Sequence, residues 1–412
     1  MIIKRDYYLQ QLISSKSNNL IKIVTGIRRS GKSFLLFNLF HNHLIETGIS
    51  EDHIIEIALD DRLNKNLRDP DVILQHIHER IVDDKLYYII LDEVQMIDEF
   101  TDVLNSLLHI RNADVYVTGS NSKFLSKDVV TEFRGRGDEI HLFPLSFAEL
   151  YNSIGGDKFE LWKSYYTYGG LPGILELDSE KKKAAYLRSL HETVYLKDII
   201  ERNNLKNSEE FMELMRVMAS CIGSPCNPSK LENTFKSVKN ETLDRKTISK
   251  YLSYMEDAFL IEKSMRYDIK GRKYIGTLSK YYFQDIGLRN ALLNFRQVEE
   301  NHIMENVIYN ELRLRGFCVD VGMVEARTAK ERKQLEVDFV ANMADRRYYI
   351  QSAFSLPDDE KRMQEKASLI NVGDSFKKII IVKDIIKPWN DDDGILTMSI
   401  FDFLLNENSL DL

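Results

Sequence analysis

Gly26-Ile-Arg-Arg-Ser-Gly31-Lys32-Ser33 reads G-x-x-x-x-G-K-[ST] and follows a run of apolar, β-branched residues, Ile21, Ile23 and Val24. A helix-like run from Phe34 to Phe40 comes directly after it. This strand–loop–helix setting is the one that a phosphate-binding loop needs. Glycines let the backbone wrap closely around phosphate oxygens, and the amides at a helix start attract anions. The stretch therefore predicts a Walker A loop that binds a nucleotide.

Two side chains of this loop have separate expected roles. Lys32 is expected to reach the β- and γ-phosphates, and the Ser33 hydroxyl is expected to ligate Mg²⁺. We therefore predict ATP as the nucleotide and Mg²⁺ as its metal. The residues expected to contact the nucleotide are Gly26, Ile27, Arg28, Arg29, Ser30, Gly31, Lys32, Ser33 and Phe34.

A short, wholly apolar run, residues 86–91, ends in the acidic pair Asp92-Glu93. Such a run suits a buried parallel strand, and two carboxylates at its end serve no packing purpose. We predict a Walker B segment in which Asp92 holds the metal and Glu93 is the general base that polarises the attacking water. The alternative is a strand followed by a solvated acidic helix cap.

The strand expected at residues 114–118 leads into Gly119-Ser120-Asn121-Ser122. In the additional-strand ATPases, the AAA+ group, a polar side chain at such a strand tip senses the γ-phosphate, so Ser120 and Asn121 are candidates for this role. The alternative is a Gly-Ser-Asn turn that caps the following helix.

Phe133-Arg-Gly-Arg136 places two guanidinium groups beside a glycine. An arginine finger stabilises charge on a phosphoryl group during its transfer, and Arg136 is the candidate. An ordinary surface arginine is the alternative, and the sequence leaves open whether Arg136 acts on its own nucleotide or on that of a neighbouring chain.

Composition supports a cytoplasmic enzyme of two or three domains. The chain has 412 residues, 43% of them hydrophobic and 29% charged, which are globular values. Three cysteines without metal-ligand spacing indicate neither a disulfide framework nor a zinc site. No apolar stretch approaches the roughly 18 residues of a membrane span, so no membrane partner is expected. A net charge of −8 gives no global attraction to nucleic acid.

The pattern along the chain predicts an α/β protein with four domains. Alternating strands and helices predict a parallel, AAA+-like P-loop NTPase sheet in residues 1–145. Its strands are expected at residues 20–25, 54–59, 86–91, 114–118 and 139–143. A helical lid (146–205), a winged-helix domain (206–292) and a nuclease-like α/β domain (293–412) are expected to follow.

The winged-helix prediction rests on three amphipathic helices and a hairpin with Lys270-Gly271-Arg272 at its tip. Nine basic and four acidic residues lie between 245 and 282, which leaves a local charge of +5. A basic wing beside a recognition-type helix suits double-stranded DNA; packing or contact with a protein partner is the alternative. The candidate DNA contacts are Lys246, Lys250, Lys270, Arg272 and Lys273.

The last domain has the expected order helix, three strands, helix, strand, which resembles the core of the PD-(D/E)xK nucleases. Glu305 and Asp338 match two of the metal-binding carboxylates of that core. The third element reads Gln351-Ser352-Ala353, so a neutral amide and a methyl replace the carboxylate and the lysine. Mg²⁺ is then held weakly and nothing orients the nucleophile. We expect a degenerate site in a retained fold, not an active nuclease.

Together these segments resemble a family of bacterial and archaeal ATP-binding proteins that join an AAA+-type ATPase domain to a C-terminal conserved region of unknown function. The resemblance spans nearly the whole chain. It rests on residues 25–33, 91–95, 117–121, 135–136, 144–147, 169–172, 195–198, 281–285 and 305–306. It implies a hydrolase that cleaves ATP with Mg²⁺, a winged-helix middle and a nuclease-like end, and it implies no agreed substrate.

The sequence thus predicts an AAA+-like ATPase whose cycle drives a change in the appended domains, with DNA as a candidate partner. The alternative is a nucleotide-gated binding module that holds ATP as a switch with negligible turnover and recognises DNA or a protein. Relatives in the AAA+ group often form rings, so an oligomer is compatible with either prediction.

Overall fold

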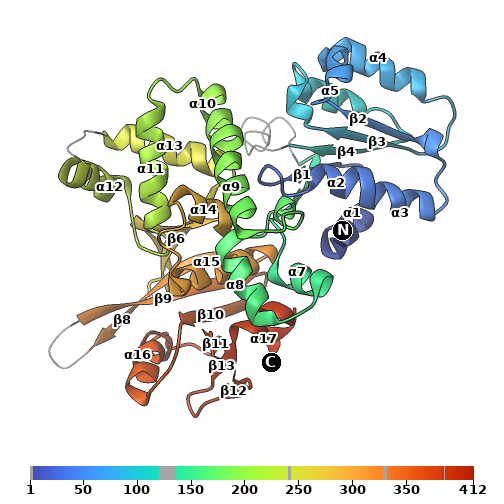
Figure 1. The fold of residues 1–412 in the computed structure, drawn as a ribbon. Coiled ribbons are helices and arrows are strands. Elements are labelled where there is room, and N and C mark those ends of the chain that lie inside the picture. Colours follow the sequence, from blue (N-terminus) through green and yellow to red (C-terminus); the bar gives the residue numbers. More distant parts are fainter. Residues whose placement is uncertain (1–2, 120–134, 240–242, 328–331, 385) are drawn as a thin grey trace. The chain divides into compact units, whose positions relative to one another are not determined.

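The computed structural model describes residues 3–119, 135–239, 243–327, 332–384 and 386–412 (Figure 1). The chain divides into two units. Unit 1 comprises residues 1–145, 171–176 and 257–259, and unit 2 comprises residues 146–170, 177–256 and 260–412. In the part of the chain that the structure describes, every helix is too short or too polar to cross a lipid bilayer.

Unit 1 contains a five-stranded sheet in the order β2-β3-β4-β1-β5, and all of its strand pairs are parallel. This confirms the predicted parallel α/β sheet, because each strand lies within a residue or two of its expected position. The strands are β1 (Ile21–Thr25), β2 (Ile54–Ala58), β3 (Tyr87–Asp92), β4 (Ala113–Thr118) and β5 (Gly137–His141).

Helices cover both faces of this sheet (Figure 1). Along β3, Tyr87, Ile89 and Leu91 pack into one core, whereas Tyr88 and Ile90 pack into the other. This double burial explains why the strand is apolar throughout instead of alternating with polar residues. The first core is closed by α4 (Pro70–Arg80) and α5 (Phe100–Leu107), and the second by α1 (Asp6–Ser14), η1 (Leu35–Phe40) and α3 (His41–Glu46).

The first part of unit 2 is helical. Its first helix, α7 (Phe147–Ile154), begins with a capping box in which Ser146 and Glu149 satisfy each other's backbone N–H groups. The following helices are α8 (Lys158–Tyr168), α9 (Glu180–Leu190), η7 (His191–Leu196), α10 (Lys197–Asn203), α11 (Ser208–Ser220), α12 (Pro228–Thr234), η8 (Phe235–Lys239) and α13 (Arg245–Asp257).

The rest of unit 2 is built around an eight-stranded mixed sheet in the order β12-β13-β11-β10-β9-β8-β6-β7. Helices α15 (Glu300–Leu314) and α17 (Ile400–Leu405) contribute to the core on one face, and α16 (Asp359–Ile370) contributes to the core on the other. The strands are β6 (Ile261–Asp268), β7 (Lys273–Phe283), β8 (Cys318–Arg327), β9 (Arg332–Met343), β10 (Arg346–Ala353), β11 (Lys377–Val382), β12 (Trp389–Asn390) and β13 (Ile395–Ser399).

The hairpin β6–β7, which the sequence placed in a winged-helix domain, belongs to this same sheet. Strand β6 runs parallel to β8, with Arg266 opposite Val321 and Asp268 opposite Met323. The expected boundary at residue 292 therefore does not separate one sheet from another. Within the two units, the finer division into four domains stays a prediction.

Candidate nucleotide site

The loop that follows β1 requires glycine at two positions. Gly26 has a φ of +137°, and a Cβ added there would lie 2.2 Å from the backbone oxygen of Leu142. Gly31 has a φ of +99° and precedes the short helix α2 (Lys32–Phe34). A Cβ added to Gly31 would lie 3.8 Å from the side chain of Pro172. Both conformations are costly for residues with a side chain.

Lys32 is buried, at 5% exposure, and its ammonium donates to the backbone oxygens of Gly26 and Ile27 at 3.0 and 3.1 Å. The loop thus curls around its own lysine. Ile27 and Ser30 are fully buried. Arg28 is half-buried, whereas Arg29, Ser33 and Phe34 are exposed.

Asp92 and Ser33 lie together, although β3 is not adjacent to β1 in the sheet. Strand β4 runs between them, yet the Ser33 side chain lies close enough to the Asp92 carboxylate to lower its pKa. Burial raises the pKa of Asp92, while hydrogen bonds from Thr118 and Ser33 partly oppose that rise. A hydroxyl and a carboxylate at one point form the oxygen donor set that Mg²⁺ prefers.

Thr118, at the end of β4, connects the two acidic residues and was missed by the sequence reasoning. Its hydroxyl donates to the Asp92 carboxylate and accepts the backbone N–H of Glu93 at 2.9 Å. Glu93 has a φ of +54°, an uncommon conformation for a residue with a side chain. The available signal was a threonine directly before Gly119, at the end of a buried strand. Ser120 and Asn121 themselves lie outside the described residues.

Glu93 also has a side-chain partner on the next turn. The Gln95 amide donates a hydrogen bond to the Glu93 carboxylate. The sequence marked Gln95 only as a point of family resemblance, because a contact two residues along an irregular turn cannot be predicted from the pattern.

Arg5 is a second residue that the sequence reasoning missed. Its guanidinium is buried and donates to the backbone oxygen of Ser30 at 3.2 Å and to that of Phe143 at 2.8 Å. It lies 4.6 Å from the ring centroid of Tyr8, whose hydroxyl accepts the Phe143 N–H at 3.1 Å. Arg5 therefore links the phosphate-binding loop to the segment after β5.

Arg136 is not brought to this site. It precedes β5, is exposed, and donates to the Asn105 side chain at 3.3 Å, while its own backbone oxygen accepts the N–H of Ile21. Ile21 begins β1, whereas the nucleotide loop follows the end of that strand. Five residues of strand separate the two edges by roughly 16 Å. Action of Arg136 on its own chain's nucleotide does not fit this placement.

A cavity of about 320 Å³ lies at the same amino edge, lined by residues such as Asn19, Arg111 and Asp114. At this edge a buried ion pair between Lys22 and Asp114 connects β1 to β4. The cavity is therefore on the side of the sheet away from the phosphate-binding loop.

A parallel sheet with a glycine-rich loop after β1 and an acidic pair after β3 defines unit 1 as a P-loop ATPase fold of the AAA+ class. Residues 18–151 match the family described as AAA domain, and residues 159–299 match a domain of unknown function, DUF8612. An uncharacterized protein of Haemophilus influenzae is 33% identical over 411 residues, which cover 98% of this chain and 99% of that protein. The chain belongs to the same family as that protein.

Three further similarities are more distant. An uncharacterized protein of Methanocaldococcus jannaschii is 29% identical over 384 residues, covering 89% of this chain and 80% of that protein. Among solved structures, the Aeropyrum pernix ORC1 protein in complex with DNA shares 11% identity over 71% of this chain and 92% of its own, with a TM-score of 0.29. Cdc6p from Pyrobaculum aerophilum shares 12% identity over 74% of this chain and 96% of its own, with a TM-score of 0.31. At these scores neither structure carries an argument about this chain.

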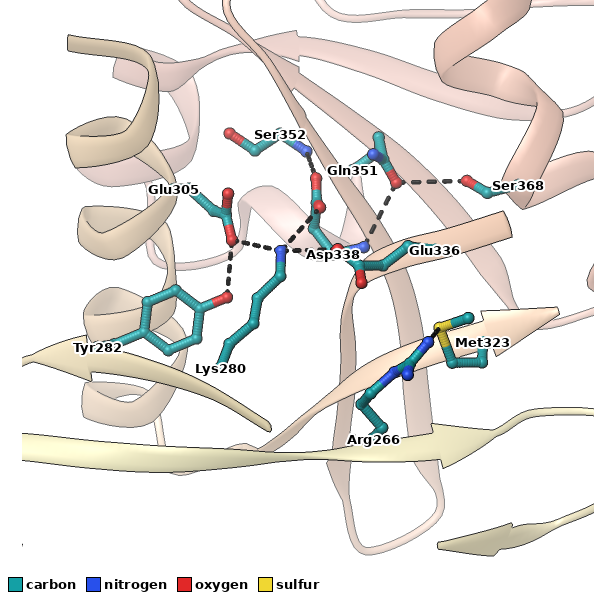
Figure 2. A network of polar contacts seen from close by, with 10 residues as sticks. All are labelled: Arg266, Lys280, Tyr282, Glu305, Met323, Glu336, Asp338, Gln351, Ser352 and Ser368. Carbon is teal, nitrogen blue, oxygen red and sulfur yellow. Dashed lines mark hydrogen bonds and ion pairs between the residues drawn. The ribbon is translucent and has the colours of Figure 1, made fainter. Parts of the chain in front are cut away.

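The three predicted residues of the degenerate nuclease site do come together in unit 2 (Figure 2). Glu305 lies on α15, Asp338 on β9 and Gln351 on β10. The Gln351 side-chain oxygen accepts the Asp338 N–H at 3.4 Å and the Ser368 hydroxyl at 3.3 Å. Lys280, from β7, contacts two of them and was counted in the sequence only as part of a basic surface.

The five candidate DNA contacts are all exposed. Lys246 and Lys250 lie one turn apart on α13, on the side away from its buried residues Ile248 and Leu252. Lys270, Arg272 and Lys273 surround the turn between β6 and β7. Because Lys280 is buried among carboxylates, it adds nothing to the positive surface that the sequence predicted.

Proposed function

We propose that the protein hydrolyses ATP with Mg²⁺ and that unit 1 holds the nucleotide. The observation that carries the proposal is the proximity of the Ser33 side chain to the Asp92 carboxylate, close enough to lower the pKa of that group. It joins the phosphate-binding loop to the acidic pair across an intervening strand, which is the arrangement that two ligands of one metal require. Mg²⁺, when bound, would neutralise charge on the phosphates.

Each residue of the site has a distinct task in this proposal. The Lys32 ammonium exchanges its contacts with the loop's own carbonyls for phosphate oxygens, which are stronger partners for a cation. Ser33 and Asp92 hold the metal. Glu93 orients and deprotonates the attacking water, and its backbone is positioned for this by Thr118.

Phosphate release and nucleotide binding, measured on three proteins, test the proposal. We expect the wild type to release phosphate, Glu93→Gln to bind ATP without turnover, and Lys32→Ala to lose both. A wild type that releases no more phosphate than Lys32→Ala, with and without duplex DNA, would contradict it.

One observation favours a second function, a nucleotide-gated binding module with negligible turnover. The Gln95 amide holds the carboxylate that would activate water. If this contact persists with ATP bound, the protein stays loaded and acts as a switch. Wild-type protein that binds ATP tightly but gains turnover only when Gln95 is replaced would establish this second function.

We further propose that Arg136 acts on the nucleotide of a neighbouring chain in an oligomer. Its place at the amino edge of the sheet, away from its own loop, supports this. Mixing Arg136→Ala with Lys32→Ala provides the test, because the first retains a complete loop and the second retains the arginine. Restored phosphate release in the mixture is expected, and two inactive variants that stay inactive together would contradict the proposal.

Duplex DNA is the proposed partner of the exposed basic residues on α13 and the β6–β7 turn. Phosphate contacts by lysine and arginine weaken steeply with salt. In a fluorescence-anisotropy titration, we expect the wild type to bind at low salt and a Lys270/Arg272/Lys273 triple-alanine variant to bind more weakly. Equal binding would point to a protein partner instead.

Unit 2 is proposed to retain a nuclease-like arrangement without nuclease activity. The neutral Gln351 side chain at the third position supports this, since one metal-binding carboxylate is lost. We expect no plasmid nicking with Mg²⁺ or Mn²⁺. Cleavage that disappears in Asp338→Ala would overturn this part of the proposal.

A further inference from the structure

The Lys280 ammonium lies at the centre of three carboxylates (Figure 2). Its nitrogen is 2.8 Å from Glu305, 2.9 Å from Glu336 and 3.5 Å from Asp338. The lysine side chain is 3% exposed, whereas those of Glu305 and Asp338 are 12% and 11% exposed. The cluster is therefore shielded from water on most sides.

The three carboxylates come from two separate elements. Glu305 projects from α15 and also accepts the Tyr282 hydroxyl at 2.8 Å. Asp338, on β9, accepts the backbone N–H of Ser352 at 2.9 Å. Glu336 lies two residues before Asp338 on the same strand, so both side chains are on one face of the sheet. The oxygens thus converge because of the fold, with Lys280 supplied by another strand.

The balance of charge requires a cation at this point. Three carboxylates this close repel one another. Those of Glu305 and Asp338, which are mostly buried, also lose hydration energy unless a positive charge compensates, whereas the Glu336 side chain is 30% exposed. Burial opposes the charged form of Lys280, but Glu305, Asp338 and Glu336 more than offset this and raise its pKa, so the ammonium stays charged. For Asp338, burial outweighs the attraction of Lys280 and raises the pKa.

We propose that Lys280 is the resident cation of this cluster and occupies the position that a divalent metal ion would take, so that unit 2 binds no metal there. Contacts of 2.8–3.5 Å suit an ammonium group, whereas Mg²⁺ needs oxygens at about 2.1 Å. In the described part of the chain, no group of three or more His, Cys, Asp or Glu residues is spaced to hold a metal ion. Two cations cannot share the position.

The neighbouring Gln351 is consistent with this substitution. Its side-chain oxygen accepts two hydrogen bonds, from the Asp338 N–H and from Ser368, so it is fixed as part of the structure. Glu336 supplies the third carboxylate that contacts Lys280. The inference about Lys280 rests on the proposal that unit 2 is not a nuclease. Its test measures metal binding, whereas the test of that proposal measures DNA cleavage, so either one can fail without the other.

Removing the ammonium should convert the cluster into a metal site. The test uses the full chain without nucleotide and with Asp92→Asn, so that unit 1 contributes no metal. In this background we compare four proteins: the one that keeps Lys280, Asp338→Asn, Lys280→Met, and Lys280→Met with Asp338→Asn. The measurements are Mn²⁺ electron paramagnetic resonance and the melting temperature with and without Mn²⁺. Methionine matches the length of lysine but carries no charge.

We expect Lys280→Met to bind about one Mn²⁺ per chain, because carboxylate oxygens suit this ion, and to melt at a higher temperature when Mn²⁺ is present. The Lys280 protein and the double variant should show neither effect. Arg313→Met is the matched control, since Arg313 is a partly buried cation paired with a single carboxylate, that of Glu262. Its loss should create no metal site.

Two results would overturn the inference. One is a folded Lys280→Met protein that gains no Mn²⁺. The other is Mn²⁺ binding by the Lys280 protein that Asp338→Asn removes. The second comparison keeps lysine in place, so it decides the matter even if Lys280→Met fails to fold.

Discussion

The Thr118 hydroxyl accepts the backbone N–H of Glu93 at 2.9 Å and at the same time donates to the carboxylate of Asp92. One side chain on β4 thus fixes both acidic residues at the end of β3. Glu93 adopts a left-handed backbone conformation with a φ of +54°, which needs such support. Thr118 is a positioning residue in the proposed ATPase.

Thr118→Val keeps the shape of the side chain and removes the hydroxyl. We expect phosphate release to fall on the order of 10- to 100-fold, the usual effect of losing a partner that orients a metal ligand. ATP binding should change much less, because the phosphate-binding loop is untouched. Thr118→Ser is the control and should retain most of the activity. Wild-type turnover in Thr118→Val would exclude a positioning role.

Gln95→Ala removes the amide that holds the Glu93 carboxylate. We expect phosphate release per bound ATP to rise, because a hydrogen bond to a charged group contributes about 1.5–3 kcal/mol and restrains the carboxylate. Single-turnover measurements at saturating ATP separate this effect from a change in affinity. A fall in turnover would instead show that Gln95 orients Glu93 productively.

Arg5→Met should destabilise unit 1 and weaken nucleotide binding. The variant leaves the backbone oxygens of Ser30 and Phe143 without the guanidinium, at a cost of about 1–3 kcal/mol for each buried acceptor that finds no other partner. Chemical unfolding and ATP titration measure the two effects. Lys4→Met is the control, because Lys4 directly precedes Arg5 and is exposed. Equal ATP affinity in Arg5→Met would show that Ser30 needs no such support.

Asp92→Asn should make the nucleotide-free protein more stable at neutral pH while abolishing metal-dependent turnover. Burial raises the pKa of Asp92 above its ordinary value near 3.8, so the folded state binds the proton more tightly than the unfolded state. Stability from this group is present at low pH and is lost as pH rises through the raised pKa. Melting temperatures of the two proteins should diverge as pH rises above 3.8, the ordinary pKa of an aspartate.

The contribution of His191 to stability depends on pH in the opposite direction to that of Asp92. Burial, helped by Arg216, lowers its pKa from 6.5 to about 4, so the unfolded state binds the proton more tightly. Stability is therefore lost as pH falls from 6.5 towards 4. We expect His191→Phe to remove part of the acid destabilisation, up to about 3 kcal/mol at pH 4. An unchanged difference in unfolding free energy between pH 7 and pH 4 would contradict this.

The sheet of unit 1 could be predicted because its signals are local. The run from Tyr87 to Leu91 is buried on both faces, and Gly26 and Gly31 adopt conformations that favour glycine. The order of elements in the C-terminal part, α15, β8, β9, β10, α16 and β11, also follows the predicted pattern.

Contacts between distant residues could not be predicted in the same way. Arg5 contacts Phe143 across 138 positions, and Thr118 contacts Asp92 across 26. Lys280 was counted as a surface charge, because nothing in its own segment indicates that carboxylates 25 to 58 positions later would surround it. The pairing of β6 with β8 was missed for the same reason, since register between remote strands leaves no local pattern.

Residues 171–176 belong to unit 1, while the chain on either side of them belongs to unit 2. Pro172 lies in this short insertion, beside Gly31 of the phosphate-binding loop. A fragment that stops at residue 145 would expose a patch normally covered by six downstream residues. Dividing the gene at the apparent end of the AAA domain would therefore separate unit 1 from a segment that packs beside its phosphate-binding loop, and nucleotide binding measured on such a fragment would say little about the intact chain.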